Sequence, residues 1–298
     1  MTKKTLQISQ IDSNSNIKLS NSECIYVLTA IDKYALVQIK NNFDYPGIKL
    51  TTEPGSTNVY LLEYDGKNIT GAVLLWSYPE TYSYKTNECT KNQMIITSDK
   101  KAVVILAEFV DGTTFANGIQ PQGAQASDYF LALFTLGQNE FGWIQTLSGV
   151  IGIPVLAVNY PNYYGTKPHV YITGTFESNL VFEPFGTSIS SDQESDMFLA
   201  KISLEGNIEW IISSDEKSTG SITAESITFG FVDRHPRLTL VGKFNDIISF
   251  RRNNEIMYLS TTGVNMWIAQ FDLEGNIVWM NSPQTEGDGY ISPTSLVS

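Results

Sequence analysis

The acidic residues of two runs are the first candidates for chemistry in this chain. Carboxylates alternate with other residues in both runs: Asp192, Glu194 and Asp196 in the first, and Glu286 and Asp288 in the second. Opposed carboxylates catalyse glycoside hydrolysis, and carboxylate oxygens are also the ligands that Ca²⁺ prefers. The first run has no central glycine of the kind that bends a calcium loop, and solvated acidic loops are far commoner than either site. We therefore expect no catalytic residue and no metal ligand here.

Histidine and cysteine are scarce, with two of each in the chain. His169 and His235 precede strands at matching places and could meet, although we expect two exposed loop residues. Cys24 and Cys89 could pair only with each other, and we favour two reduced thiols because disulfide frameworks normally contain more cysteines. The spacings form no zinc motif, and phosphate-binding glycine loops and Gly-x-Ser-x-Gly elbows are absent. We expect no cofactor.

One loop is rich in aromatic side chains. Tyr160, Tyr163 and Tyr164 lie close together, flanked by Pro161 and Gly165. Tyrosines on a loop bind sugars or protein partners, because the ring is apolar and the hydroxyl is polar. The same residues could equally cover a hydrophobic edge. We regard them as a possible ligand-contact loop.

The elements that must position these residues follow from a repeat. Four tryptophans recur at intervals of 67, 67 and 69 residues: Trp76, Trp143, Trp210 and Trp279. Each closes a similar phrase, which is clearest over residues 196–210 and 265–279. Self-similarity at a fixed period is the signature of a repeat architecture.

Each repeat is predicted to contain four β-strands. Alternating apolar, β-branched and aromatic runs predict strands at 154–159, 169–176, 197–203 and 208–213 in the third repeat, and at 25–30, 34–40, 59–64 and 72–78 in the first. The last two strands of a repeat form a hairpin, whose tight turn needs a left-handed residue at Gly206 and at Gly275. Helical periodicity is absent. The pattern predicts an all-β fold, a four-bladed β-propeller.

The predicted propeller is a single domain over 1–298. Its repeats span about 24–78, 93–148, 153–213 and 225–282. A closed ring needs its first and last blades tied together, because an open ring exposes strand edges. The segment 291–298 is a possible closing strand, and 5–11 is another candidate strand. The alternative is that two chains combine their repeats into one larger ring.

The periodic tryptophans are predicted to pack between adjacent sheets. Truncating a buried tryptophan typically costs about 3–5 kcal/mol, so Trp210→Ala and Trp279→Ala should destabilise far more than a polar loop change. A sugar-stacking role is less favoured, because regular periodicity suits a core better than one pocket. Gly174 and Gly242 each lie inside a predicted strand, shortly before a pair of aromatic residues. A glycine inside a strand predicts a β-bulge or the close approach of another backbone. Such a close approach would fit the crowding between neighbouring blades.

The phrase from Asp196 to Trp210 resembles the signature of the SBBP-type β-propeller repeat family, and so does the strand at 170–174. The resemblance covers roughly 90–281, best in the last two repeats. It implies a propeller fold and transfers no catalytic residues. The family's bacterial members have shorter repeats and are usually exported, whereas this chain shows no export signal. Its Ile- and Asn-rich composition resembles products of AT-rich genomes, giant viruses among them.

The net charge of −12 argues against a nucleic-acid partner, because binding phosphates requires clustered lysine and arginine. No run of apolar residues is long enough for a membrane helix. We expect an intracellular protein, with association to a virion as the alternative. The leading hypothesis is a non-enzymatic scaffold that presents loops to a protein partner. A carbohydrate-binding propeller is the alternative, and a glycosidase is less favoured.

Overall fold

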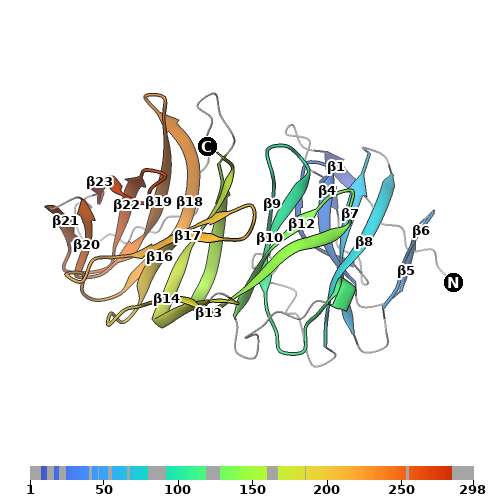
Figure 1. The fold of residues 1–298 in the computed structure, drawn as a ribbon, viewed down its shortest axis with the longest axis horizontal. Helices are drawn as coiled ribbons and strands as arrows, with labels where there is room; N and C mark the ends of the chain where they lie inside the picture. The colour runs from blue at the N-terminus through green and yellow to red at the C-terminus, as the bar shows by residue number, and fades with distance from the viewer. Residues whose placement is uncertain are drawn as a thin grey trace. The chain divides into compact units, whose positions relative to one another are not determined.

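The computed structural model in Figure 1 is built almost entirely of antiparallel β-strands. It describes residues 8–11, 17–19, 25–39, 42–45, 47–52, 56–65, 68–79, 92–118, 128–159, 167–184, 186–252 and 255–283. The only helical element in these residues is a short 3-10 turn, Ala116–Gly118. The predicted all-β class is confirmed. The chain divides into two compact units, 1–146 and 147–298, which are described in turn.

The first unit opens with a four-stranded antiparallel meander. Its strands, in sheet order, are β3 (Ile25–Ile31), β4 (Tyr34–Ile39), β7 (Thr57–Tyr64) and β8 (Ile69–Tyr78). A small hairpin of β5 (Phe43–Tyr45) and β6 (Ile48–Leu50) is inserted between the second and third strands, and another, β1 (Ile8–Ile11) with β2 (Ile17–Leu19), precedes them. Each strand starts within three residues of its predicted position.

The second meander follows the same order. It consists of β9 (Gln93–Ile96), β10 (Ala102–Glu108), β12 (Tyr129–Thr135) and the first part of β13 (Glu140–Val158). The short β11 (Thr114–Phe115) pairs with β8. Edge-to-face aromatic contacts fill the core, with Phe130 against both Trp76 and Phe115 at centroid distances of 5.0 and 4.9 Å.

The second unit begins with the rest of β13. In sheet order it is followed by β14 (His169–Glu183), β16 (Asp196–Ser203) and β17 (Ile208–Ser213), with β15 (Thr187–Ser190) paired to the far end of β14. A separate strand beginning at Pro154 was predicted. That boundary is wrong, because β13 runs unbroken from the second meander into the third, with left-handed glycines at Gly149 and Gly152 within it.

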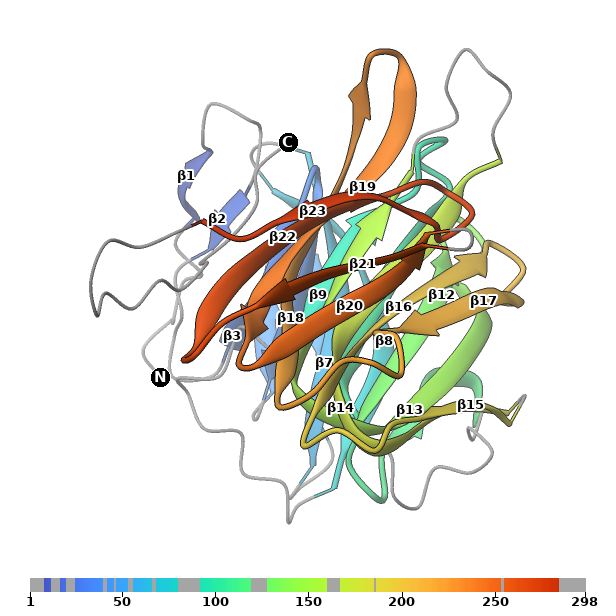
Figure 2. The same ribbon diagram turned by 90° about the vertical axis from the view of Figure 1, so that its left-hand side faces the viewer.

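The fourth meander is the clearest in Figure 2, where its strands are drawn in orange and red. Its order is β18 (Ile222–Val232), β19 (His235–Phe244), β22 (Asn265–Phe271) and β23 (Ile277–Asn281). A hairpin of β20 (Ile247–Arg252) and β21 (Glu255–Ser260) is inserted between β19 and β22. In the first, third and fourth meanders, the long connection between second and third strands therefore forms a hairpin, where the sequence indicated only a loop.

The two predicted hairpin turns are confirmed. Gly206 and Gly275 have φ values of +87° and +85°, the left-handed region that glycine tolerates best. In each turn, the glycine N–H donates to the carbonyl of the residue three positions earlier, Ser203 and Asp272. The possible closing strand at 291–298, and Cys24 and Cys89, lie outside the described residues.

The close approach predicted at Gly174 and Gly242 is also present, but its cause differs from the one expected. A Cβ on Gly242 would lie 1.8 Å from the carbonyl oxygen of Thr223, and one on Gly174 would lie 2.8 Å from the Phe198 ring. Phe198 and Trp267 are the direct cross-strand partners of these glycines. The crowding therefore arises inside each meander, where an aromatic ring covers the glycine of the neighbouring strand.

Candidate functional site

The periodic tryptophans occupy different environments. Trp76 is fully buried, and Trp143 and Trp210 are half-buried. Trp279 is 36% exposed, and its indole N–H donates to Gln270 Oε1 at 2.8 Å. The expected core role is therefore wrong for Trp279. The fully buried tryptophan of the fourth meander is Trp267, and its place in the repeated phrase, after Met266 as Phe198 follows Met197, could have identified it.

Trp210 packs against the neighbouring sheet, as was predicted for all four periodic tryptophans. A Cβ on Gly275 would lie 3.4 Å from three atoms of the Trp210 ring, so the turn between β22 and β23 packs against the indole of β17. The tryptophan of the third meander therefore lies against the hairpin turn of the fourth. The glycine is needed there for its left-handed φ, since the ring itself leaves room for ordinary van der Waals contact.

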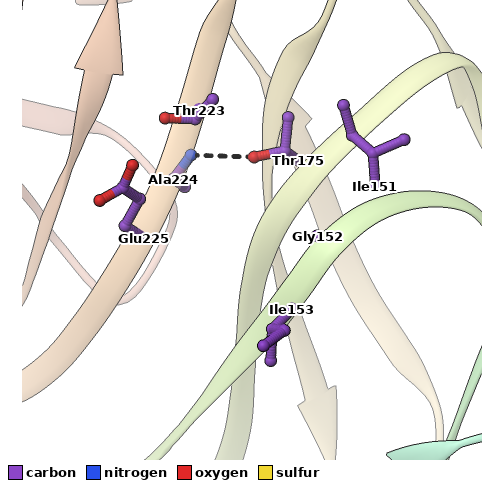
Figure 3. A pocket seen from close by; sticks show the side chains of 7 residues that line it. All are labelled: Ile151, Gly152, Ile153, Thr175, Thr223, Ala224 and Glu225. Carbon is purple, nitrogen blue, oxygen red and sulfur yellow. Dashed lines mark hydrogen bonds between the residues drawn. The ribbon is translucent and has the colours of Figure 1, made fainter. Parts of the chain in front are cut away.

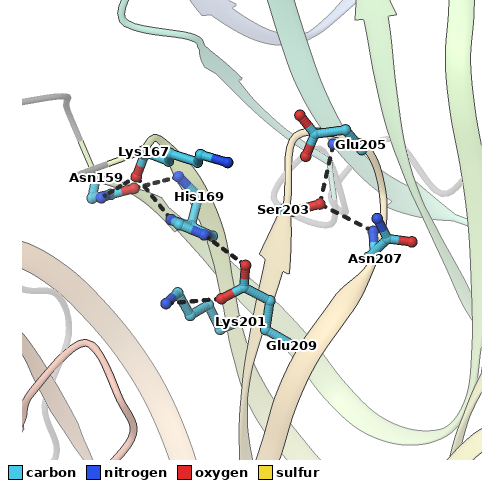
Figure 4. Close-up of polar contacts among 8 residues, drawn as sticks. All are labelled: Asn159, Lys167, His169, Lys201, Ser203, Glu205, Asn207 and Glu209. Carbon is cyan, nitrogen blue, oxygen red and sulfur yellow. Dashed lines mark hydrogen bonds and ion pairs between the residues drawn. The ribbon is translucent and has the colours of Figure 1, made fainter. Parts of the chain in front are cut away.

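A polar cluster joins β14, β16 and β17 (Figure 4). Glu209 bridges two side chains, with Oε1 at 2.9 Å from His169 Nε2 and Oε2 at 2.9 Å from Lys201 Nζ. The other ring nitrogen of His169 lies 2.8 Å from the Lys167 carbonyl oxygen. Glu209 is the extra residue of a β-bulge, between the pairs Lys201↔Trp210 and Ile202↔Ile208. The bulge aims its carboxylate at the neighbouring strands.

This cluster is saturated with partners. Burial opposes ionisation of Glu209, but the hydrogen bonds from Lys201 and His169 outweigh it and lower the pKa of the carboxyl. Both ring nitrogens of His169 already face oxygens, so neither is free to take a proton from a substrate. The arrangement suits a structural ion-pair network. His235, the other histidine, is exposed at the start of β19.

Glu209→Gln should remove part of the acid sensitivity of the second unit. Because the pKa of Glu209 is lowered by folding, its stabilising contribution is complete above the unfolded value and is lost as the pH falls through the folded value. The carboxylate is partly exposed, so we expect a cost of about 1 kcal/mol or less at pH 7. Urea unfolding of both proteins measures this at neutral pH and below pH 4. If the difference in free energy of unfolding between wild type and Glu209→Gln grows on acidification, the lowered pKa of Glu209 is contradicted.

Two buried polar atoms next to this cluster have no hydrogen-bond partner within the described part of the chain: Tyr171 Oη and Trp210 Nε1. The two rings are neighbours, with centroids 6.2 Å apart. Burial, and then the negative charges of Glu209 and Glu274, raises the pKa of the Tyr171 phenol above its ordinary value. Tyr171 therefore stays neutral across the physiological range.

The acidic residues of the run at 192–196 lie in different environments. Asp192 and Glu194 are exposed, whereas Asp196 is only 2% exposed. Asp196 Oδ1 accepts from the Met197 N–H at 2.7 Å and from the Ser214 N–H at 3.4 Å. Burial outweighs these bonds and raises the pKa of Asp196. Among the described residues, no three His, Cys, Asp or Glu side chains gather closely enough to hold a metal ion. Glu286 and Asp288 lie outside them.

A pocket of about 410 Å³ lies between β13, β14 and β18 of the second unit (Figure 3). Glu225, the extra residue of a bulge in β18, contributes the one carboxylate among the described residues of the lining, and it pairs with Lys243 at 2.7 Å. Thr175 Oγ1 accepts from the Ala224 N–H at 3.2 Å. The lining combines this polar side with an apolar one, and consists of Ile151, Gly152, Ile153, Thr175, Thr223, Ala224 and Glu225.

The tip of the β18–β19 hairpin exposes two neighbouring apolar side chains. β19 pairs with β22 only from Leu238 onwards, so the last three pairs of the hairpin stand beyond the sheet. Phe231 and Val232 in this extension are 49% and 43% exposed. The Phe231 ring is held edge-to-face against Phe229, with centroids 5.4 Å apart. The tip therefore presents a supported aromatic ring to solvent.

Sequence reasoning missed this hairpin. It selected Tyr160, Tyr163 and Tyr164 instead, which lie outside the described residues. A signal was available, because Phe231 and Val232 directly precede a polar turn, and apolar residues next to a turn are candidates for exposure. What the sequence could not show is how far β19 extends past its neighbour.

The described residues include no helix with the length and apolar character needed to cross a membrane. In comparisons with known proteins, no family model matches the chain and no curated protein is significantly similar to it.

Proposed function

We propose that this protein is a non-enzymatic interaction scaffold, a four-bladed β-propeller that binds a protein partner through the β18–β19 hairpin. The observation that carries the proposal is the exposed Phe231 and Val232 at a hairpin tip standing beyond its sheet. Isolated two-stranded ribbons are marginally stable in water, and exposed aromatic residues add a cost in solubility. A binding role gives both features a reason.

The propeller reading is supported by the meanders. Four successive segments follow the same order of four antiparallel strands, the second and third sharing the long strand β13, and this order is like that of propeller blades. The packing of Trp210 against the Gly275 turn of the next segment supports the blade-to-blade contact that such a ring repeats. The resemblance of residues 196–210 to the SBBP-type repeat points in the same direction. A rigid ring would hold its hairpins at defined positions.

The hairpin has the chemistry of an interface anchor. Aromatic side chains dominate binding energy because they bury a large area and lose few rotatable bonds. The Phe231 ring is already oriented by Phe229, so less conformational entropy is lost when a partner covers it. The polar cluster around Glu209 has its partners within the chain, and this leaves the hairpin as the better candidate for recognition.

Phe231→Ser should weaken partner binding without affecting the fold. Removing an aromatic anchor costs about 2 kcal/mol or more, which corresponds to a loss of affinity of about thirtyfold or more. The partner is captured from extract of the source cells, and its affinity is then compared for wild type and variant. Tyr258→Ser is the matched control, because Tyr258 is 68% exposed on β21.

Equal loss in both variants, or loss in neither, would contradict a role for the hairpin. Carbohydrate binding is the second candidate, because the pocket beside Glu225 combines a carboxylate, threonine hydroxyls and an apolar wall. It ranks lower because the described residues of the lining include no aromatic ring on which a sugar could stack. Binding to a glycan array that Phe231→Ser leaves intact would favour this alternative.

A further inference from the structure

The arginines of the chain are concentrated in one segment, which includes the hairpin tip. All four arginines of the chain lie between 234 and 252. Arg251 is engaged, because it contacts Asp215 at 3.1 Å and Glu216 at 3.6 Å. Arg234 and Arg237, by contrast, have no carboxylate partner in the part of the chain that the structure describes, and Arg234 is exposed. Arg237 is half-buried and donates from Nη1 to the Pro236 carbonyl oxygen at 3.0 Å. The tip therefore carries one exposed guanidinium group, that of Arg234, and a second whose other N–H groups have no carboxylate partner among the described residues.

The backbone conformation of the turn between β18 and β19 is unfavourable for Arg234. Asp233 and Arg234 have φ values of +49° and +66°, so both central residues of this two-residue turn are left-handed. Such turns strongly prefer Asn-Gly or Asp-Gly. A side chain other than that of glycine, Asn or Asp costs about 1–2 kcal/mol in this region. A strained arginine at an exposed tip points to a use for its side chain.

The tip extends beyond the sheet to which it belongs. The three pairs beyond β22 extend about 10 Å, whereas charges are screened over about 8 Å at physiological salt. Charged groups of the chain that lie further than this from the tip are therefore largely screened there. Against Asp233, the two arginines leave a local excess of positive charge beside Phe231.

The outer edge of β19 at the tip is unsuited to pairing with another strand. Pro236 lies opposite Phe231, in the second pair from the turn. In a two-residue hairpin, the backbone groups of that pair point outward, and proline has no N–H to donate. A partner at this edge must therefore contact side chains, and the ones available are an aromatic ring and two guanidinium groups.

We propose that the hairpin tip binds an acidic segment of its protein partner that wraps the tip, with carboxylates at Arg234 and Arg237 and apolar side chains against Phe231 on one face of the hairpin and Val232 on the other. This inference rests on the proposed function and names the chemistry of the partner. Arginine forms paired hydrogen bonds with carboxylates, and aromatic–arginine surfaces are typical of interface centres. An anionic membrane is the less favoured occupant, because two arginines provide little attraction for a chain with a large negative charge.

The test uses full-length protein in which Val232 is replaced by photo-reactive benzoylphenylalanine. The protein is irradiated in extract of the source cells, and the cross-linked peptides are identified by mass spectrometry. We expect peptides of net negative charge from one protein. Cross-linking should fall about tenfold when Arg234→Glu and Arg237→Glu are combined, and also at about 0.5 M salt, which screens the charges. Arg252→Glu is the control, since Arg252 is exposed at the end of a different hairpin.

Arg234→Gly separates binding from folding. Glycine relieves the left-handed strain, so the melting temperature should be unchanged or higher while cross-linking falls. Specific cross-links to neutral or basic peptides, unaffected by charge reversal, would overturn the inference and leave the proposed function standing. Sedimentation with phosphatidylserine vesicles that Arg234→Gly abolishes would also overturn it. The absence of any specific cross-link would instead overturn the proposed function.

Discussion

Replacing Gly242 with alanine is expected to destabilise the second unit by about 3 kcal/mol, which lowers its melting temperature by roughly 6–12 °C. The new Cβ would lie 1.8 Å from the Thr223 carbonyl oxygen and 2.8 Å from Trp267 Nε1. The nearest atom belongs to the backbone of the paired strand β18, so a rotamer change cannot relieve the clash. The strands must separate, and this breaks the pairing on both sides.

Two other glycines of the fourth meander provide matched controls. A Cβ on Gly230 or on Gly263 would meet no heavy atom within 4 Å. Gly230→Ala and Gly263→Ala should therefore change the melting temperature by no more than about 2 °C, or raise it, because alanine restricts the unfolded chain. Thermal unfolding followed by circular dichroism measures all three variants. Equal effects at Gly242 and Gly230 would show that the close approach does not exist in solution.

Trp267→Ala should be among the most damaging side-chain truncations in the second unit, with an expected cost of about 3–5 kcal/mol. The indole is fully buried and packs at 6.1 Å from the Phe250 ring, and its N–H donates to the Thr223 carbonyl at 2.9 Å. Truncation would leave a large cavity and remove the bond to that buried carbonyl. Trp267→Phe should be milder, since it retains most of the apolar contact.

Trp279→Ala is the control for this prediction. Trp279 is partly exposed on the outermost strand β23, so we expect a loss below about 1 kcal/mol. Chemical denaturation of the two alanine variants gives both free energies of unfolding. An equal loss would mean that Trp279 is covered in solution, and it would restore the common packing role expected from the sequence period.

Local patterns were sufficient for most strands. The run 208–213 was predicted at the bounds that the structure has, because β-branched and aromatic residues lie between a glycine turn and a serine-rich segment. Gly206 and Gly275 were equally predictable, because a tight turn needs a left-handed residue and glycine adopts it at least cost. The long β13 was not, since Gly149 and Gly152 can either end a strand or bend it, and only the neighbouring strands decide which.

Burial was predictable only in part. The period of the tryptophans is a property of the sequence, but the exposure of each indole depends on what the next segment places against it. Trp210 is covered by the Gly275 turn, whereas Trp279, at the same place in the phrase, is partly exposed. Asp196 illustrates the same limit, because nothing local distinguished its buried carboxylate from the exposed Asp192.

By itself, the sequence determined that this chain is an all-β protein, and it located the glycine turns at Gly206 and Gly275 that precede β17 and β23. It could do so because strand propensity and turn chemistry act over a few neighbouring residues. Only the tertiary structure decided that Glu209 joins His169 and Lys201, and that β19 extends past β22 to expose Phe231. Both depend on register between strands distant in sequence, which packing sets and local preference does not.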